Sequence, residues 1–266
     1  MPAVQLARLK TQVYEISWLF TRPDEFCAAV NRLLQTYADV LFREGKAVKP
    51  VSLLEMYHVP SLVLRQMRLQ IGQLCLENPQ AALGVVDALL ADPHLEVKLL
   101  GAGLLGFIPL EPPLNLENRL SDGLTRYQDP SVREALLDEG TARLRRDRPA
   151  RMLDLAAAFL NRERSQEKAT GLQLLARLAR EDHFENLPAV FNMISPLFGR
   201  FSVDLQSDLL ALLLVLARKS QNELVFFLRQ MLSLHPSPAL KRFTRRSLAS
   251  FPPAVQSALR LILQQI

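Results

Sequence analysis

The sequence predicts an all-α protein built from stacked helix pairs, and three observations support this fold class. Hydrophobic residues make up 49% of the chain, whereas glycine is scarce, at 10 of 266 residues. Alternating runs of Val, Ile and Thr, which would indicate strands, are absent. An Asp or Ser that opens an amphipathic helix recurs at nearly constant spacing, and a shorter helix precedes it. A helix pair repeated about every 35 to 40 residues is typical of an α-solenoid with one continuous core.

The helix openings carry the repeat. They are Asp92, Asp129, Ser165, Ser202 and Ser237, so consecutive openings are 37, 36, 37 and 35 residues apart. An Asp or Ser side chain can accept a hydrogen bond from a free amide of the first helical turn. In three of the five openings proline follows, and proline fits the first helical position because its missing N–H has no partner there. We therefore expect these five residues to cap helices.

The N-terminal part predicts helices at residues 3–20, 23–43, 52–57, 61–77, 79–91 and 94–107. Thr21 is expected to cap the second helix, with Pro23 in its first turn. The clearest loop is 44–50. Three prolines between residues 109 and 113 predict a stiff extended connection to the helices that follow.

One opening resembles the second helix of a HEAT repeat. The residues that carry this resemblance are Asp129, Pro130, Val132, Arg133 and, slightly displaced, Ala135 and Leu136. The resemblance implies a right-handed α–α superhelix in which the second helix of each pair lines the concave face. We expect a single HEAT-like domain over residues 1–266, with N-terminal repeats in 1–108 and basic C-terminal repeats in 114–266.

Other segments resemble the HEAT-like DNA alkylation repair glycosylases. They are Val59, Pro60, Leu62 and Arg65, then His94, Glu96, Val97, Lys98 and Leu100, and later the runs 217–225 and 245–248. That family implies a basic DNA cleft and a catalytic Asp flanked by tryptophans. The only tryptophan here is Trp18, in the first helix. The nearest Asp to the expected position is Asp122, which is either catalytic or a solvated helix carboxylate. Lys168 could stand where the family has a basic residue.

Positive charge is concentrated in the second half. Residues 1–128 contain 12 Lys and Arg against 13 Asp and Glu, and residues 129–266 contain 20 against 14. The candidate nucleic-acid-binding residues within this half are Arg143, Arg145, Arg146, Arg148, Lys168, Lys241, Arg242, Arg245 and Arg246. Cations along a superhelix would form an electrostatic track for phosphates.

The alternative is that cations near helix C-termini favour the helix dipole. This explanation fits the cluster from Arg143 to Arg146, which ends a predicted helix. It fits the cluster from Lys241 to Arg246 less well, because we expect these residues in the first half of theirs.

The helix predicted at residues 203–219 is unusual because its stretch from Leu209 to Ala217 is apolar on every side. It is either a central helix packed on all faces or an apolar strip that receives an amphipathic helix of a partner protein. The neighbouring Phe226, Phe227 and Met231 would serve either purpose.

Motifs for metal, nucleotide or nucleophilic chemistry are absent. The four histidines are scattered, and no phosphate-binding glycine loop or GxSxG sequence occurs. Cys27 and Cys75 are interpreted as buried thiols in a reducing compartment, with a regulatory disulfide as the alternative. The N-terminus lacks the apolar core of a signal peptide, and no apolar run reaches the about 20 residues that cross a bilayer. We expect a cytoplasmic protein that needs no membrane, metal or cofactor.

Together these features predict a non-catalytic binding scaffold whose basic C-terminal half engages an anionic partner, either double-stranded DNA or an acidic protein. One alternative is an active DNA glycosylase of the HEAT-like type. The other is a scaffold for protein–protein assembly that uses the apolar region 209–217.

Overall fold

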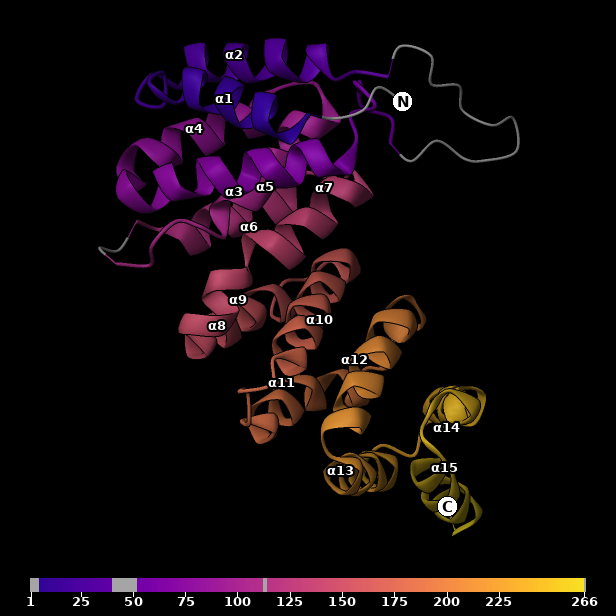
Figure 1. Cartoon of the computed structure of the whole chain (residues 1–266). Helices are drawn as coiled ribbons and strands as arrows, with labels where there is room; N and C mark the ends of the chain where they lie inside the picture. The colour runs from indigo at the N-terminus through magenta and orange to yellow at the C-terminus, as the bar shows by residue number, and fades with distance from the viewer. Residues whose placement is uncertain (1–4, 40–51, 112–113, 266) are drawn as a thin grey trace. The chain divides into compact units, whose positions relative to one another are not determined.

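The computed structural model describes residues 5–39, 52–111 and 114–265, and the regular elements within these ranges are all helical (Figure 1). The all-α prediction is therefore confirmed for the described chain. Contacts between Cα atoms divide the chain into two compact units, Met1–Leu144 and Arg145–Ile266, which are described separately. The border falls within a helix and not at the connection 109–113. A single domain stays a prediction.

Unit 1 stacks its helices in two rows. Its elements are α1 (Leu6–Ser17), α2 (Pro23–Thr36), α3 (Ser61–Glu77), α4 (Pro79–Ala91), α5 (Leu95–Leu105), α6 (Leu116–Arg126), α7 (Pro130–Ala135), the π-helical turn η1 (Leu136–Gly140) and the first residues of α8 (Ala142–Asp147). Helix α1 packs against α3, α2 packs against α4, and α5 packs against α3 and α4 (Figure 1). The core between them contains the fully buried side chains of Phe26, Met67 and Leu104.

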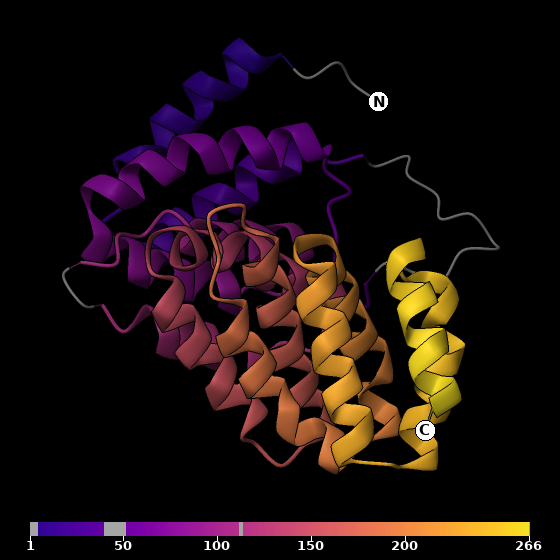
Figure 2. The same ribbon diagram turned by 90° about the horizontal axis from the view of Figure 1, so that it is seen from below.

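Unit 2 repeats this kind of packing. Its elements are the end of α8, α9 (Pro149–Leu160), α10 (Ser165–Arg180), α11 (Leu187–Gly199), the 3-10 turn η2 (Val203–Leu205), α12 (Gln206–Lys219), α13 (Gln221–Leu234), α14 (Pro238–Ser247), the 3-10 turn η3 (Leu248–Ser250) and α15 (Pro253–Gln265). Helix α10 packs between α9 and α12, and α13 packs against α15 (Figures 1 and 2). Phe159 and Phe198 are fully buried here.

Three of the five predicted helix caps are confirmed. Asp129 accepts hydrogen bonds from two free amides of α7, Ser202 accepts one from the first turn of η2, and Ser237 accepts one from that of α14. The other two predictions are wrong. Ser165 is the first residue of α10 and caps nothing, and Asp92 bonds to the backbone N–H of His94, one residue before α5 begins.

Several predicted boundaries also differ. Residues 52–57 form no helix: the Ser52 hydroxyl donates a hydrogen bond to Asp129, and the backbone carbonyl of Glu55 accepts one from Leu95. These long-range bonds replace the local bonds of a helix. Thr21 does not cap α2, which begins at Pro23 with no side-chain cap. The prediction that this helix continues to about residue 43 is wrong, because α2 ends at Thr36 and residues 37–39 are not helical. The predicted loop 44–50 lies outside the described residues.

The chain after Asp129 contains a π-helical turn, where a regular helix was expected. The backbone N–H of Thr141 donates to the carbonyl of Leu136, five residues earlier, at 3.1 Å. The turn lies very close to α5: a Cβ added at Gly106 would meet the carbonyl oxygen of Glu139 at 2.1 Å. Close approach of two backbones requires glycine, because any side chain would occupy the space between them.

None of the helices within the described ranges combines the length and the apolar character needed to cross a membrane.

Candidate functional site

Several of the candidate cations at the turn between α8 and α9 form hydrogen bonds or ion pairs with other residues of the chain. The Arg143 guanidinium donates to the backbone carbonyl of Phe107 at 2.7 Å. Arg145 Nε lies 2.7 Å from Oε1 of Glu181, and its side chain is only 12% exposed. Arg146 pairs with the adjacent Asp147 at 2.9 Å and is largely exposed, as is Arg148. Arg146 and Arg148 are thus the members of this cluster that present charge to solvent.

The second cationic position surrounds the start of α10. Lys168 lies there and is half-buried. Nearby, Arg162 lies over the ring of Phe159, 4.2 Å from its centroid, and pairs with Glu167 at 3.2 Å. Arg164, directly before the helix, is exposed. The charge here is partly neutralised by the chain's own carboxylate.

Helix α14 has the clearest division between a buried face and a cationic face. Leu240, Phe243, Thr244 and Ser247 are buried, Lys241 is half-buried, and Arg242, Arg245 and Arg246 are exposed. The expectation that the four cations occupy the first half of their helix is wrong, because α14 ends at Ser247 and places Arg245 and Arg246 in its last turn. Cations there interact favourably with the helix dipole, by about 0.3 to 1 kcal/mol each.

The difference in charge is larger between the two units than between residues 1–128 and 129–266. Unit 1 contains 14 Lys and Arg against 17 Asp and Glu, and unit 2 contains 18 against 10. Beyond Asp208 the chain has eight Lys and Arg and a single acidic residue, Glu223. The last three helices therefore carry almost no carboxylate that could neutralise the cations of α14.

Asp122 lies on α6 and is exposed to solvent. Trp18 lies just after α1, is 67% exposed, and is covered on one face by the guanidinium of Arg22, 4.6 Å from the ring centroid. A catalytic carboxylate usually lies in a cleft that perturbs its pKa. The exposure of Asp122 agrees with a solvated helix carboxylate.

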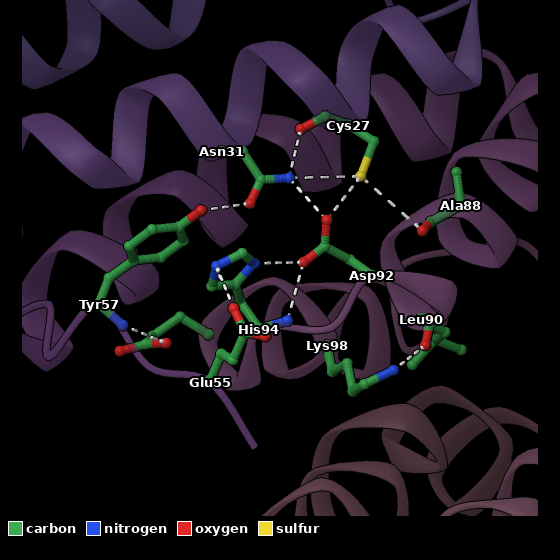
Figure 3. A network of polar contacts seen from close by, with 10 residues as sticks. Cys27, Asn31, Glu55, Tyr57, Ala88, Leu90, Asp92, His94 and Lys98 are labelled. Carbon is green, nitrogen blue, oxygen red and sulfur yellow. Dashed lines mark hydrogen bonds and ion pairs between the residues drawn. The ribbon is translucent and has the colours of Figure 1, made fainter.

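A polar network joins three parts of unit 1 around Asp92, which lies between α4 and α5 (Figure 3). Its carboxylate accepts hydrogen bonds from Asn31 Nδ2 at 2.7 Å and from the backbone N–H of His94 at 2.9 Å. The Tyr57 hydroxyl donates to Oδ1 of Asn31 at 2.7 Å, and the Tyr57 ring stacks on the imidazole of His94. Burial acts to raise the pKa of Asp92, but the bonds from His94 and Asn31 outweigh it, and the net pKa is lowered.

Cys27 lies beside this network but is not poised for chemistry. Its Sγ is 3.7 Å from Oδ2 of Asp92 and 3.8 Å from the carbonyl oxygen of Ala88. Burial, and then the negative charge of Asp92, raise the pKa of this thiol to about 12. Cys27 is half-buried, whereas Cys75 is fully buried, and burial raises the pKa of the Cys75 thiol to about 12. Both cysteines are free, so the structure contains no disulfide between them.

Helix α12 is packed on most sides. Six residues of the run from Leu209 to Ala217 are buried, while Ala211 is exposed. The helix lies against α10 and α13. The central-helix interpretation therefore describes it better than an open apolar strip does.

The open apolar surface of unit 2 lies instead between α11 and α13. There a cavity of about 480 Å³ is lined by Pro188, Phe191, Asn192, Asn222, Glu223, Phe226, Phe227 and Gln230. Phe226 is 70% exposed, whereas Phe227 and Met231 are buried. Of the three residues singled out beside α12, Phe226 is the one that solvent reaches.

Sequence reasoning missed a groove in unit 1 between α3, α5 and the α7–η1 segment, here called the α3–η1 groove. Two adjoining cavities of about 400 and 540 Å³ share Leu99, Ala135 and Glu139. The first is also lined by Ser61, Leu62, Leu64, Arg65, Arg68 and Leu100, and the second by Pro130, Ser131, Glu134 and Asp138. Arg68 forms an ion pair with Glu139 across the groove. The spacing of Arg65 and Arg68, one helical turn apart, was the available signal.

Among the described residues, no group of three or more His, Cys, Asp and Glu is arranged to hold a metal ion. Comparison of the chain with models of protein families, with curated proteins and with solved structures found no match.

Proposed function

We propose that this protein is a non-catalytic helical-repeat scaffold of the HEAT type, a right-handed α–α superhelix, whose basic C-terminal half binds the phosphate backbone of double-stranded DNA. The packing within each unit supports the repeat architecture. Alternate helices lie against one another, α1 against α3 and α2 against α4 in unit 1, and α10 against α12 in unit 2. Stacked repeats build their core from such contacts between neighbouring pairs.

The observation that carries the proposal is the solvent face of α14. It presents Arg242, Arg245 and Arg246 together on an exposed side, and its other side is anchored by Leu240 and Phe243. Like charges one turn apart repel each other and destabilise a helix slightly. A polyanion would relieve that repulsion by neutralising the cations and releasing its own counterions.

The chemistry of this face favours a phosphate backbone over an acidic protein. Apart from Pro238, the exposed residues of α14 are all arginines. A protein interface generally has an apolar core surrounded by a polar rim, whereas contacts to phosphates need only cations and hydrogen-bond donors. The binding that we propose is therefore independent of base sequence.

The test is fluorescence anisotropy of a labelled DNA duplex, titrated with the full chain over a series of salt concentrations. We expect affinity to fall as salt rises. The variant Arg242→Ala/Arg245→Ala should bind more weakly, and the slope of log K against log salt should decrease by about 2, one for each lost phosphate contact. The control Arg8→Ala/Arg32→Ala removes the same charge from exposed positions of unit 1 and should leave the slope unchanged.

Failure of the wild-type protein to bind the duplex at low salt would refute the proposal. Equal effects of both double variants would show attraction by net charge alone and would refute the assignment to α14. Binding to an acidic protein such as polyglutamate, without binding to DNA, would favour the acidic-protein alternative.

The cavity between α11 and α13 supports a second candidate function, the assembly of proteins. Exposed Phe226 beside Phe191 and Pro188 forms an apolar surface edged by amide side chains. Aromatic residues at the centre of such surfaces often dominate binding energy between proteins. A Phe226→Ala variant that lost a protein partner but kept DNA affinity would separate this function from that of α14.

A further inference from the structure

The α3–η1 groove combines charges of both signs within a small space. Arg65 and Arg68 lie one turn apart on α3, and Arg68 pairs with Glu139 of the π-helical turn. Burial lowers the pKa of Arg68, and the positive charge of Arg65 lowers it further. Arg65 and Arg68 therefore repel each other even though Arg68 is paired with Glu139. A ligand anion placed beside Arg65 would offset this repulsion.

The opposite wall of the groove is acidic. Glu134 and Asp138 line the adjoining cavity together with Glu139, and both have contacts of their own within the chain. Their charge disfavours a purely anionic ligand, because it would approach three carboxylates. Arg65 and Arg68 equally disfavour a purely cationic ligand. The electrostatics of the groove therefore suit a ligand that carries one charge of each sign.

The two charges of that ligand must be close together. Arg68 and Glu139 are in direct contact, so the basic and acidic sides of the groove meet within one cavity. The same cavity is also lined by the apolar side chains of Leu62, Leu99 and Leu100. The cavity volume of about 400 Å³ falls within the range of about 300 to 1,000 Å³ that is usual for small-molecule sites.

The backbone around Glu139 is itself unusual. π-Helical turns are rare and occur frequently at functional sites. Here the turn carries Glu139, and a Cβ added at Gly103 of α5 would come within 2.7 Å of Oε2 of that side chain and within 2.6 Å of Cδ of Arg68. Gly103 thus leaves room for the ion pair that forms the charged end of the groove.

We propose that the α3–η1 groove binds a free α-amino acid with a large apolar side chain. The carboxylate of the ligand bonds to Arg65, its ammonium group bonds to Glu139, and its side chain lies on Leu62 and Leu99. An α-amino acid carries both charges on a single carbon atom, which matches the contact between the basic and acidic walls. A carboxylate has lone pairs for several donors, so Glu139 can accept from the ligand while it remains paired with Arg68.

Isothermal titration calorimetry of the full chain with L-leucine tests this assignment. We expect saturable binding with a Kd of about 1 mM or below. N-acetyl-L-leucine lacks the ammonium charge and L-leucinamide lacks the carboxylate. Each should bind at least about tenfold more weakly, because each lacks one of the two charged contacts that L-leucine makes with the groove.

Two variants locate the site. Arg65→Gln removes the cation that faces the carboxylate and should weaken L-leucine binding about tenfold. Arg32→Gln, at an exposed position of α2, should have no effect. Circular dichroism should show the same helix content in both, because both arginines are exposed on helices whose cores are unchanged.

The proposal is overturned by any of three results: no saturable binding of L-leucine, equal binding of N-acetyl-L-leucine, or unchanged binding in Arg65→Gln. The analogue series uses the wild-type chain and so decides the matter even if a variant is unstable. None of these outcomes bears on α14, which belongs to the other unit.

Discussion

The imidazole Nδ1 of His94 lies 2.9 Å from Oδ1 of Asp92, in the turn between α4 and α5. The same carboxylate also holds Asn31 of α2, and the stacked ring of Tyr57 covers His94 from the other side (Figure 3). The Asp92 carboxylate therefore connects α2, the turn between α4 and α5, and the segment that contains Tyr57. Loss of its negative charge should weaken the packing of all three parts.

Replacing Asp92 with Ala should destabilise the protein by about 2 kcal/mol, because Asn31 and the His94 amide would lose a charged acceptor in a half-buried place. Urea unfolding at neutral pH measures this change. The exposed Asp122→Ala is the control, expected within about 0.5 kcal/mol of wild type. A similar small effect for both would contradict the importance of the network.

Stability should also fall in acid because of Asp92. The folded state lowers the pKa of this carboxyl below its ordinary value of 3.8, so the contribution is fully present above that value and is lost as the pH falls through the lower folded pKa. Unfolding free energies of wild type and Asp92→Asn, measured from pH 6 downward, should converge in this acid range. Parallel curves would show that Asp92 is not the group responsible.

Both cysteines should resist thiol reagents in the folded protein. Burial raises the pKa of the Cys27 and Cys75 thiols to about 12, so almost no thiolate is present near neutral pH. With Ellman's reagent at pH 8, labelling should be slow in buffer and rapid in urea. Rapid labelling of one thiol in buffer would show that it is accessible and reactive.

Gly106→Ala should disturb the π-helical turn. The added methyl group would meet the carbonyl oxygen of Glu139 at 2.1 Å, and a backbone atom cannot move aside as a flexible side chain can. We expect a loss of about 1 to 3 kcal/mol in unfolding free energy. Gly199→Ala, whose nearest neighbour is the His235 side chain at 3.3 Å, should change stability little.

Arg145 and Arg148 should differ in how much they contribute to stability. Arg145→Ala leaves Glu181 without its partner in a largely buried place and should cost about 1 to 2 kcal/mol in stability. Arg148→Ala should leave stability within about 0.5 kcal/mol, because its side chain is exposed. Thermal unfolding of the two variants gives the comparison. Equal melting temperatures would contradict the role of the Arg145 pair.

The sequence predicted the helices of the chain well where local signals agree. Apolar spacing located α3 and α4, and Pro79 marks the first position of α4. A short polar side chain followed by proline located the caps Asp129 and Ser237, but the same pattern at Asp92 did not give a cap. The prediction failed at residues 52–57. Ser52 and Glu55 form hydrogen bonds with Asp129 and Leu95, which are distant in sequence, and these bonds take the place of local helical ones.

The sequence predicted the candidate sites less well than it predicted the helices. Clusters of arginine are visible in the sequence, but the partner of Arg145 lies 36 residues away, and only packing reveals that this cation is neutralised. The α3–η1 groove depends on residues from α3, α5 and η1. No local pattern links Arg68 to Glu139, and the spacing of residues 130–147 does not predict a π-helical turn.

That turn holds one residue more than an α-helical turn would. Each residue of an α-helix advances the chain by about 100° around the axis. Deleting one residue between Leu136 and Gly140 would therefore restore a regular helix and rotate everything after it by about this angle. Leu144 would leave the core, and the guanidinium of Arg143 would no longer reach the carbonyl of Phe107. The phase of α8 is thus set by a single inserted residue, and a deletion there should be far more disruptive than a substitution.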